Sequence, residues 1–139
     1  MSLFNVFDIS ASGMSAQSVR LNTTASNIAN ADSVSSSIDQ TYRARQPVFA
    51  AQMQKAAAGQ EASVGVDVLG IVESDKPLNM EYSPNHPMAN KDGYIFKPNV
   101  NVIEEMTNMI SASRSYQTNV QLAESAKNMV NKTLLLGQR

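Results

Sequence analysis

The strongest constraint on the fold is a long stretch at the carboxyl end, because no residue between Val100 and Leu136 is Gly or Pro. Apolar residues recur through it in alternating steps of three and four, as they do on a helix that buries one side. Pro98 precedes the stretch and Gly137 follows it, in the order that helix boundaries prefer. The pattern predicts one uninterrupted helix that presents a stripe of side chains to a partner: Val102, Met106, Met109, Ser113, Tyr116, Val120, Ala123, Lys127, Val130 and Leu134.

The length of this helix bears on what covers its stripe. A helix of about 35 residues is roughly 50 Å long. A compact domain of 139 residues has a radius of gyration of only about 14 Å. We therefore expect the helix to project beyond any core that the chain can build, with part of its stripe free to meet other chains.

A second apolar rhythm begins near the amino terminus and predicts a shorter helix. Asp8 and Arg20 are the only charged residues from Leu3 to Ala29, so the rest of this helix is polar without charge. Asn30 is a candidate C-cap, because Asn tolerates the left-handed backbone conformation. Such a helix either docks on its own domain or takes part in a coiled-coil-like contact. The apolar rhythm comprises Phe4, Phe7, Ala11, Met14, Ser18, Leu21, Ala25 and Ile28.

The middle of the chain predicts a small β element. Residues 31–40 are rich in Ser and Asp and are typical of a loop. Residues 41–53 and 63–74 alternate apolar and polar side chains, as half-buried strands do, and "AAAGQEA" between them is a candidate hairpin connection. Asp92-Gly93 predicts a turn before "YIF". The expected fold is mainly α with a small β insertion, its terminal amphipathic helices packed as a coiled-coil-like pair.

Composition and motifs argue against several functions. The formal net charge is -1 with both signs mixed along the chain, which excludes the electrostatic footprint of a nucleic-acid-binding protein. The absence of Cys excludes thiolate metal sites and Cys nucleophiles. Glu104 and Glu105 point about 100° apart on a helix, so they do not converge on one substrate atom. We expect no enzyme activity, no cofactor, no metal and no small-molecule substrate.

The amino-terminal "MSLFNVFDIS" lacks the charged and apolar regions of a secretory signal, and no segment approaches the length of a membrane helix. The chain is therefore expected to stay in the cytoplasm or to leave the cell by a route without signal cleavage.

Several segments together resemble a known family. They are "LNTTASNIANADS" (21–33), "PNVNVIEEMTNMISASRSYQTNVQ" (98–121) and "KTLLLGQ" (132–138), with "YRARQPVF" (42–49) the best match in the middle. The chain is similar here to the bacterial flagellar basal-body rod proteins. Its short length, "FDISASGM" (7–14) and "DGYIFKPNV" (92–100) resemble the proximal-rod members of that family. The motif positions carried over from the resemblance are Asn22, Ala25, Asn27, Ala29, Asn30, Arg114, Tyr116 and Asn119.

The resemblance implies a structural role. Members of this family polymerise helically into the periplasmic rod of the flagellum, and they are exported unfolded by the flagellar type III apparatus. It implies that residues 1–33 and 99–139 form a discontinuous helical domain around the export channel, and that residues 34–98 form an outer layer. The implied partners are other copies, other rod subunits, proteins at the junction with the membrane ring, and the export gate. A cytoplasmic helical adaptor or chaperone that binds a partner helix remains the alternative.

Three sets of residues carry these expectations. The assembly seam consists of Phe4, Phe7, Met14, Leu21, Ala25, Ile28, Met106, Met109, Tyr116, Val120, Ala123, Val130 and Leu134. The candidate channel-lining residues are Asn22, Thr23, Ser26 and Asn30, and the candidate element for the export gate is Phe4, Phe7 and Ile9.

Overall fold

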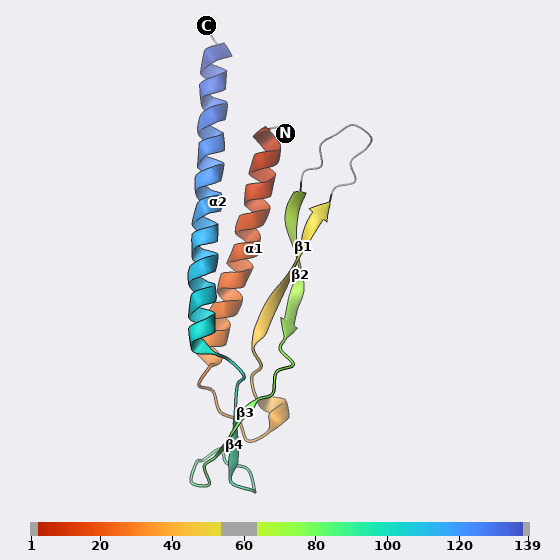
Figure 1. The fold of residues 1–139 in the computed structure, drawn as a ribbon, viewed down its shortest axis with the longest axis vertical. Helices are drawn as coiled ribbons and strands as arrows, with labels where there is room; N and C mark the ends of the chain where they lie inside the picture. The colour runs from red at the N-terminus through yellow and green to blue at the C-terminus, as the bar shows by residue number, and fades with distance from the viewer. Residues whose placement is uncertain (1–2, 54–63, 138–139) are drawn as a thin grey trace.

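The computed structural model describes residues 3–53 and 64–137. Two long helices lie side by side and antiparallel, and a long β-hairpin runs along the first helix on the side away from the second (Figure 1). A smaller hairpin sits at the end where the first helix stops and the second starts. The order of elements is α1, a short 3-10 helix η1, β1, β2, β3, β4 and α2. The fold is therefore mainly helical with a small β insertion, as expected.

Helix α1 spans Leu3–Asn30, which confirms the predicted first helix and its end. The predicted left-handed C-cap is wrong, because no non-glycine residue in the described part of the chain has a positive φ. Asn30 instead turns its amide back, and its Nδ2 donates to the carbonyl of Ser26 at 2.8 Å. The backbone N–H and the hydroxyl of Ser33 both donate to the Asn30 carbonyl. The bonds from Ser33 satisfy a carbonyl that the end of the helix leaves open, without left-handed backbone.

Helix α2 spans Val102–Gly137, which confirms the uninterrupted helix, although Gly137 belongs to the helix and does not follow it. Asn101 caps it, since its Oδ1 accepts the backbone N–H of Ile103 at 3.1 Å and that of Glu104 at 3.4 Å. Glu104 and Glu105 lie in the first turn, where the helix dipole favours negative charge. The carboxyl end of α2 extends well beyond the amino end of α1 (Figure 1). This confirms that the helix outreaches the partner it has within its own chain.

The Asn101 cap supports a direct prediction. Asn101→Ala removes the acceptor for both N–H groups and is expected to lower the free energy of unfolding by about 1 kcal/mol. Asn101→Asp keeps the acceptor and adds charge at the helix N-terminus, so its stability should match or exceed that of the parent chain. Urea unfolding followed by circular dichroism compares the two variants. Unchanged stability in Asn101→Ala would show that the cap contributes nothing, and equal losses in both variants would show that the acceptor is not the cause.

The larger hairpin consists of β1 (Arg45–Met53) and β2 (Val64–Glu73), which confirms both predicted strands. The strands pair antiparallel from Arg45 opposite Glu73 to Met53 opposite Val64, with a β-bulge between Val48 and Phe49. The predicted connection "AAAGQEA" (56–62) lies outside the described residues. A two-stranded hairpin is barely stable alone, so its position depends on what holds it to α1.

The smaller hairpin consists of β3 (Asn79–Tyr82) and β4 (Tyr94–Lys97), paired antiparallel. Gly93 has a φ of 81°, which confirms the predicted turn before the "YIF" strand. The segment at 31–40 holds more structure than a loop, since η1 covers Ile38–Gln40 and Ser35 exchanges backbone hydrogen bonds with Phe96. These bonds tie the chain after α1 to the chain before α2.

The apolar core is small. Among the described residues, the buried apolar side chains are few and include Ala16, Ile95, Phe96, Ala112 and Ala126, while many large apolar side chains are exposed. Within residues 3–53 and 64–137, no helix has both the length and the apolar character needed to cross a bilayer. Extensive exposed apolar surface along the helices indicates a surface for interaction with other molecules.

Candidate functional site

The two helices meet through small and polar side chains rather than through large apolar ones. Asn27 is 1% exposed and Thr23 is 5% exposed, and Ser10, Ala16 and Thr24 are buried with them on α1. The facing positions on α2 are Glu105, Ala112 and Ala126. Small side chains allow the two backbones to approach closely, so the uncharged polar side of α1 packs inside the chain.

Three contacts establish the register of the helices. A Cβ atom at Gly13 would lie 2.8 Å from Asn119 Nδ2, so Asn119 packs directly on that glycine. Arg20 Nη2 donates to Asn108 Oδ1 at 3.0 Å, and Asn27 Nδ2 donates to Glu105 Oε2 at 3.0 Å. With an equal rise per residue in both helices, this antiparallel register sets several seam residues at matching heights. Met14 then lies level with Tyr116, Leu21 with Met109, and Phe7 with Ala123.

The seam residues lie beside the helix contact and not within it. Successive helical residues are rotated by about 100°. On both helices, this places the seam about a quarter turn from the residues that join the helices. Because the helices are antiparallel, the two rotations bring both stripes to the same side of the pair. The hairpin contacts α1 through Ser12 and Asn27, away from both stripes, so no element within residues 3–53 and 64–137 covers the apolar side of the helix pair.

Exposure along this apolar side differs between the helices. On α2, Val120 is 40% exposed, and Met106, Tyr116 and Leu134 are also exposed. The α2 seam residues that are half-buried are Met109, Ala123 and Val130. On α1, Ala25 is exposed, whereas Phe7, Met14, Leu21 and Ile28 are half-buried. The side chain of Phe4 lies outside the described part. The expectation that the two seams pack on each other within the chain is therefore met only in part.

The candidate channel-lining residues differ in their exposure and in their hydrogen bonds. Asn22 is exposed, as a lining residue must be. Thr23 is buried, with its hydroxyl donating to the Val19 carbonyl at 2.9 Å, which corrects the expectation that it faces a channel. The Ser26 hydroxyl lies 3.3 Å from that of Tyr42, and the Asn30 amide caps its own helix. The reason is that α1 uses most of its polar side for packing and capping inside the chain.

The remaining candidate residues are placed as follows. Phe7 and Ile9 of the export element are half-buried on α1. Asn119 packs on Gly13. The other motif positions, Ala29 and Arg114, are exposed. Asn27 lies deepest, at the point where α1, β1 and α2 meet.

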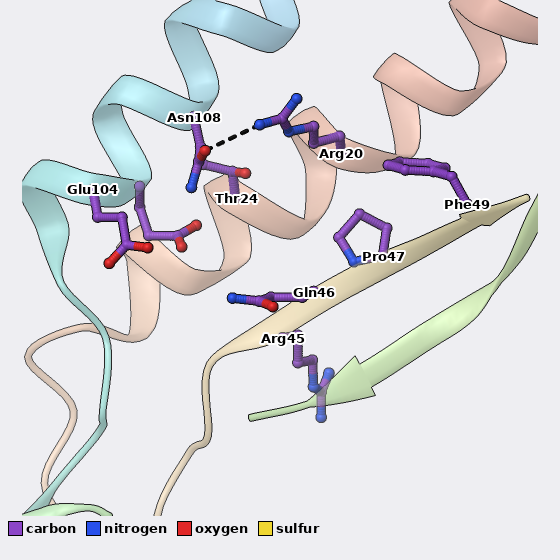
Figure 2. Close-up of a pocket in the computed structure, with 9 residues that line it drawn as sticks. Arg20, Thr24, Arg45, Gln46, Pro47, Phe49, Glu104 and Asn108 are labelled. Atoms are coloured by element: carbon purple, nitrogen blue, oxygen red, sulfur yellow. Dashed lines mark hydrogen bonds between the residues drawn. The ribbon is translucent and has the colours of Figure 1, made fainter. Parts of the chain in front are cut away.

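A groove of about 400 Å³ runs between β1 and the start of α2. Figure 2 shows Gln46, Pro47 and Phe49 along β1, with Glu104 and Asn108 across the groove on α2. Arg20 reaches across from α1 to hydrogen-bond with Asn108. The lining residues contain no His, Cys or Ser, so the groove lacks the Ser–His or Cys–His pair of a hydrolytic site.

Sequence reasoning missed the partners of two residues. The sequence indicated only that Glu105 does not converge with Glu104 on one substrate atom, but Glu105 is buried and accepts a hydrogen bond from Asn27. The role of Asn99, which precedes α2 and bonds to the base of the β1–β2 hairpin, was not expected either. The spacing of the small and polar residues Ser10, Gly13, Ala16, Thr23 and Asn27 was the available signal, because it follows one side of α1.

Comparison with known proteins gives matches at both ends of the chain. Residues 7–35 match the family described as flagella basal body rod protein. Residues 91–136 match the family described as flagellar basal body rod FlgEFG protein C-terminal. The two matched segments contain α2 up to Leu136 and most of α1.

Relatives align over nearly the full length. The chain is 49% identical over 138 residues to the flagellar basal-body rod protein FlgC of Salmonella typhimurium, covering 99% of this chain and 100% of that protein. It is 50% identical over the same shares to FlgC of Escherichia coli O157:H7. It is 43% identical over 140 residues to FlgC of Buchnera aphidicola from Acyrthosiphon pisum, again covering 99% and 100%.

Proposed function

This chain belongs to the flagellar basal-body rod protein family, and from that premise we infer that it is a structural subunit of the flagellar basal body and not an enzyme. Its relatives are FlgC rod proteins that align over their whole length. We propose that it polymerises helically with itself and with other rod subunits to form the proximal rod. The observation that carries the proposal is the uncovered apolar side of the helix pair.

The arrangement of that side favours an open helical assembly. The apolar stripe of α2 continues past the end of α1, where Leu134, Leu135 and Leu136 are exposed. Because the apolar stripe of α2 is longer than α1, neighbouring chains are needed at more than one position along the α2 axis to cover it. Contacts between different surfaces of successive copies generate helical filaments. We propose that the seam residues make coiled-coil-like contacts between subunits in this way.

We further propose that the subunit contributes an inner and an outer layer to the rod. Residues 1–33 and 99–139 would form the inner, axial layer, and residues 34–98 would form the outer layer. The hairpin lies along one side of α1 only, so it leaves the apolar side of the helix pair free for axial neighbours. Asn22 is the candidate that keeps an exposed, neutral side chain for a channel lining.

Delivery to the rod would use the flagellar type III route, with Phe4, Phe7 and Ile9 as the candidate element recognised by the export gate. The mature subunit would lie in the periplasmic part of the rod and contact proteins at the junction with the membrane ring. The match to the rod protein family and the apolar amino-terminal segment support the proposal of these partners.

Complementation of a strain that lacks the gene tests the proposal. The full-length chain should restore swimming in soft agar and should co-purify with detergent-extracted basal bodies. A cytoplasmic adaptor, the alternative function, would restore swimming but remain in the soluble fraction at a fixed stoichiometry with its partner. Recovery of the chain only in that soluble complex would overturn the proposal.

A further inference from the structure

A single buried side chain joins three elements. Asn27 Nδ2 donates to the Arg45 carbonyl at 2.8 Å and to Glu105 Oε2 at 3.0 Å. Its Oδ1 accepts the Arg45 backbone N–H at 2.9 Å and the Tyr42 hydroxyl at 2.9 Å. An Asn side chain offers two donor hydrogens and two acceptor lone pairs, and here all four are used. Asn27 thus holds both backbone groups of the first residue of β1 and a carboxylate of α2.

A second asparagine, on the segment before α2, holds the same end of the hairpin, where Ala44 precedes β1 and Ser74 follows β2. Asn99 Oδ1 accepts the backbone N–H of Ala44 at 2.8 Å. Its Nδ2 donates to the carbonyl of Lys76 at 2.8 Å and to that of Ser74 at 3.4 Å. The Ser74 N–H donates to the Ala44 carbonyl at 2.8 Å and closes this end of the hairpin. The segment that leads into α2 therefore holds the chain just before β1 and just after β2.

The far part of the hairpin packs on α1 with fewer side-chain hydrogen bonds among the described residues. Along the described part of β2, the Val66 N–H donates to the Ser12 hydroxyl at 3.1 Å, and Gly65 packs on the same serine. The outer surface of the strand carries exposed Leu69 and Ile71. The side-chain hydrogen bonds that can set the direction of the hairpin are thus concentrated where β1 begins and β2 ends.

We propose that Asn27 and Asn99 form a clamp that sets the direction of the β1–β2 hairpin relative to the two helices, so that the axial and outer parts of the subunit move as one body. Both are positioning residues, and the proposal rests on the structural role in the rod given above. Asn27 has this effect through its amide, which must donate to Glu105 and to Arg45 at once.

A double-mutant cycle tests the Asn27 half of the clamp in the full-length chain. Asn27→Asp loses both donors and sets a second carboxylate against Glu105, so the folding equilibrium constant should fall by about tenfold to a hundredfold. Glu105→Gln keeps an acceptor for Asn27 and should change little. In the double variant, the amide introduced at position 105 can donate to the carboxylate introduced at position 27, and part of the loss should return. A double variant no better than Asn27→Asp alone would contradict the pairing.

Asn90→Asp is the matched control. Asn90 uses only its Oδ1, which accepts the N–H groups of Asp92 and Tyr94, each at 2.9 Å. The same change from amide to carboxylate therefore keeps both bonds. Its stability should equal that of the parent chain.

A distance measurement tests direction separately from stability. The chain contains no Cys, so spin labels at Asn22→Cys and Leu69→Cys, both exposed positions, report the distance between α1 and the hairpin without background. Dipolar spectroscopy should give one narrow distribution in the parent chain and in Asn90→Asp. It should give a broadened one in Asn27→Asp and in Asn99→Asp, which loses the donors to Ser74 and Lys76.

Two outcomes overturn the clamp. One is a narrow, unchanged distribution in Asn27→Asp and Asn99→Asp, even if both are less stable. The other is a broad distribution already present in the parent chain. Neither depends on swimming or on basal-body recovery, so failure of the clamp and failure of the proposed role in the rod are told apart.

Discussion

Val120→Asp is expected to abolish rod assembly and swimming while leaving the isolated chain folded. Val120 lies on the apolar side of the helix pair and is 40% exposed in the single chain, so a carboxylate there meets solvent until a neighbour covers it. In the assembly the charge would be buried without a partner, at a cost of several kcal/mol in each repeated contact. Soft-agar swimming and basal-body yield measure assembly, and circular dichroism of the purified chain measures the fold.

The neighbouring position supplies the control. Gln121 is exposed and is rotated by about 100° from Val120, so Gln121→Asp adds the same charge on another side of α2. It should retain most of the swimming. Normal swimming with Val120→Asp would remove the main support for assembly through this apolar side.

Leu21→Asp should also prevent assembly, but for a mixed reason. Leu21 is half-buried beside α2 in the single chain, so the carboxylate would already disturb the contact between the helices. Its purified form should lose helicity as well. Comparing it with Val120→Asp separates residues that serve the fold from residues that serve the neighbours.

Ala112→Leu is expected to have the second large effect, this time on the subunit itself. Ala112 is 0% exposed at the contact of α2 with α1, where small side chains allow close approach. Three added carbon atoms would push the helices apart, at a cost of about 1–3 kcal/mol. Thermal unfolding of the purified chain should move to lower temperature, and swimming should fall with it.

Ser111→Leu is the matched comparison, because Ser111 precedes Ala112 on α2 and is exposed. The same bulk at that position should leave thermal unfolding almost unchanged. If both variants unfold like the parent chain, the close contact of the helices is not needed for stability.

The sequence predicted the helices and strands of this fold far better than it predicted which side of each helix is buried. An uninterrupted stretch without Gly or Pro specified α2, and alternation with a turn signal specified the strands, because both depend on local conformation. The choice of which side of α1 packs inside the chain depends on a partner that is distant in sequence. Large apolar residues predicted one side, but the chain buries the adjacent side most deeply, through Ala16, Thr23 and Asn27.

The hydrogen bonds of Asn27 show why the contacts between elements could not be predicted from the sequence. Glu105 lies 78 residues from Asn27, and nothing local to either residue indicates that they meet. A buried carboxylate in the first turn of a helix has the same sequence signature as an exposed one. The resemblance to rod proteins marked Asn27 as a motif residue, but only the structure identifies its four hydrogen bonds to three partner residues.

The unequal lengths of the helices have a mechanical consequence. α1 has 28 residues and α2 has 36, so the two helices of a copy do not end at the same height. In a stack of such copies, α2 of one copy would extend across the gap between two successive α1 helices. No single cross-section would then cut every axial contact, and a twisting load would always meet an unbroken helix.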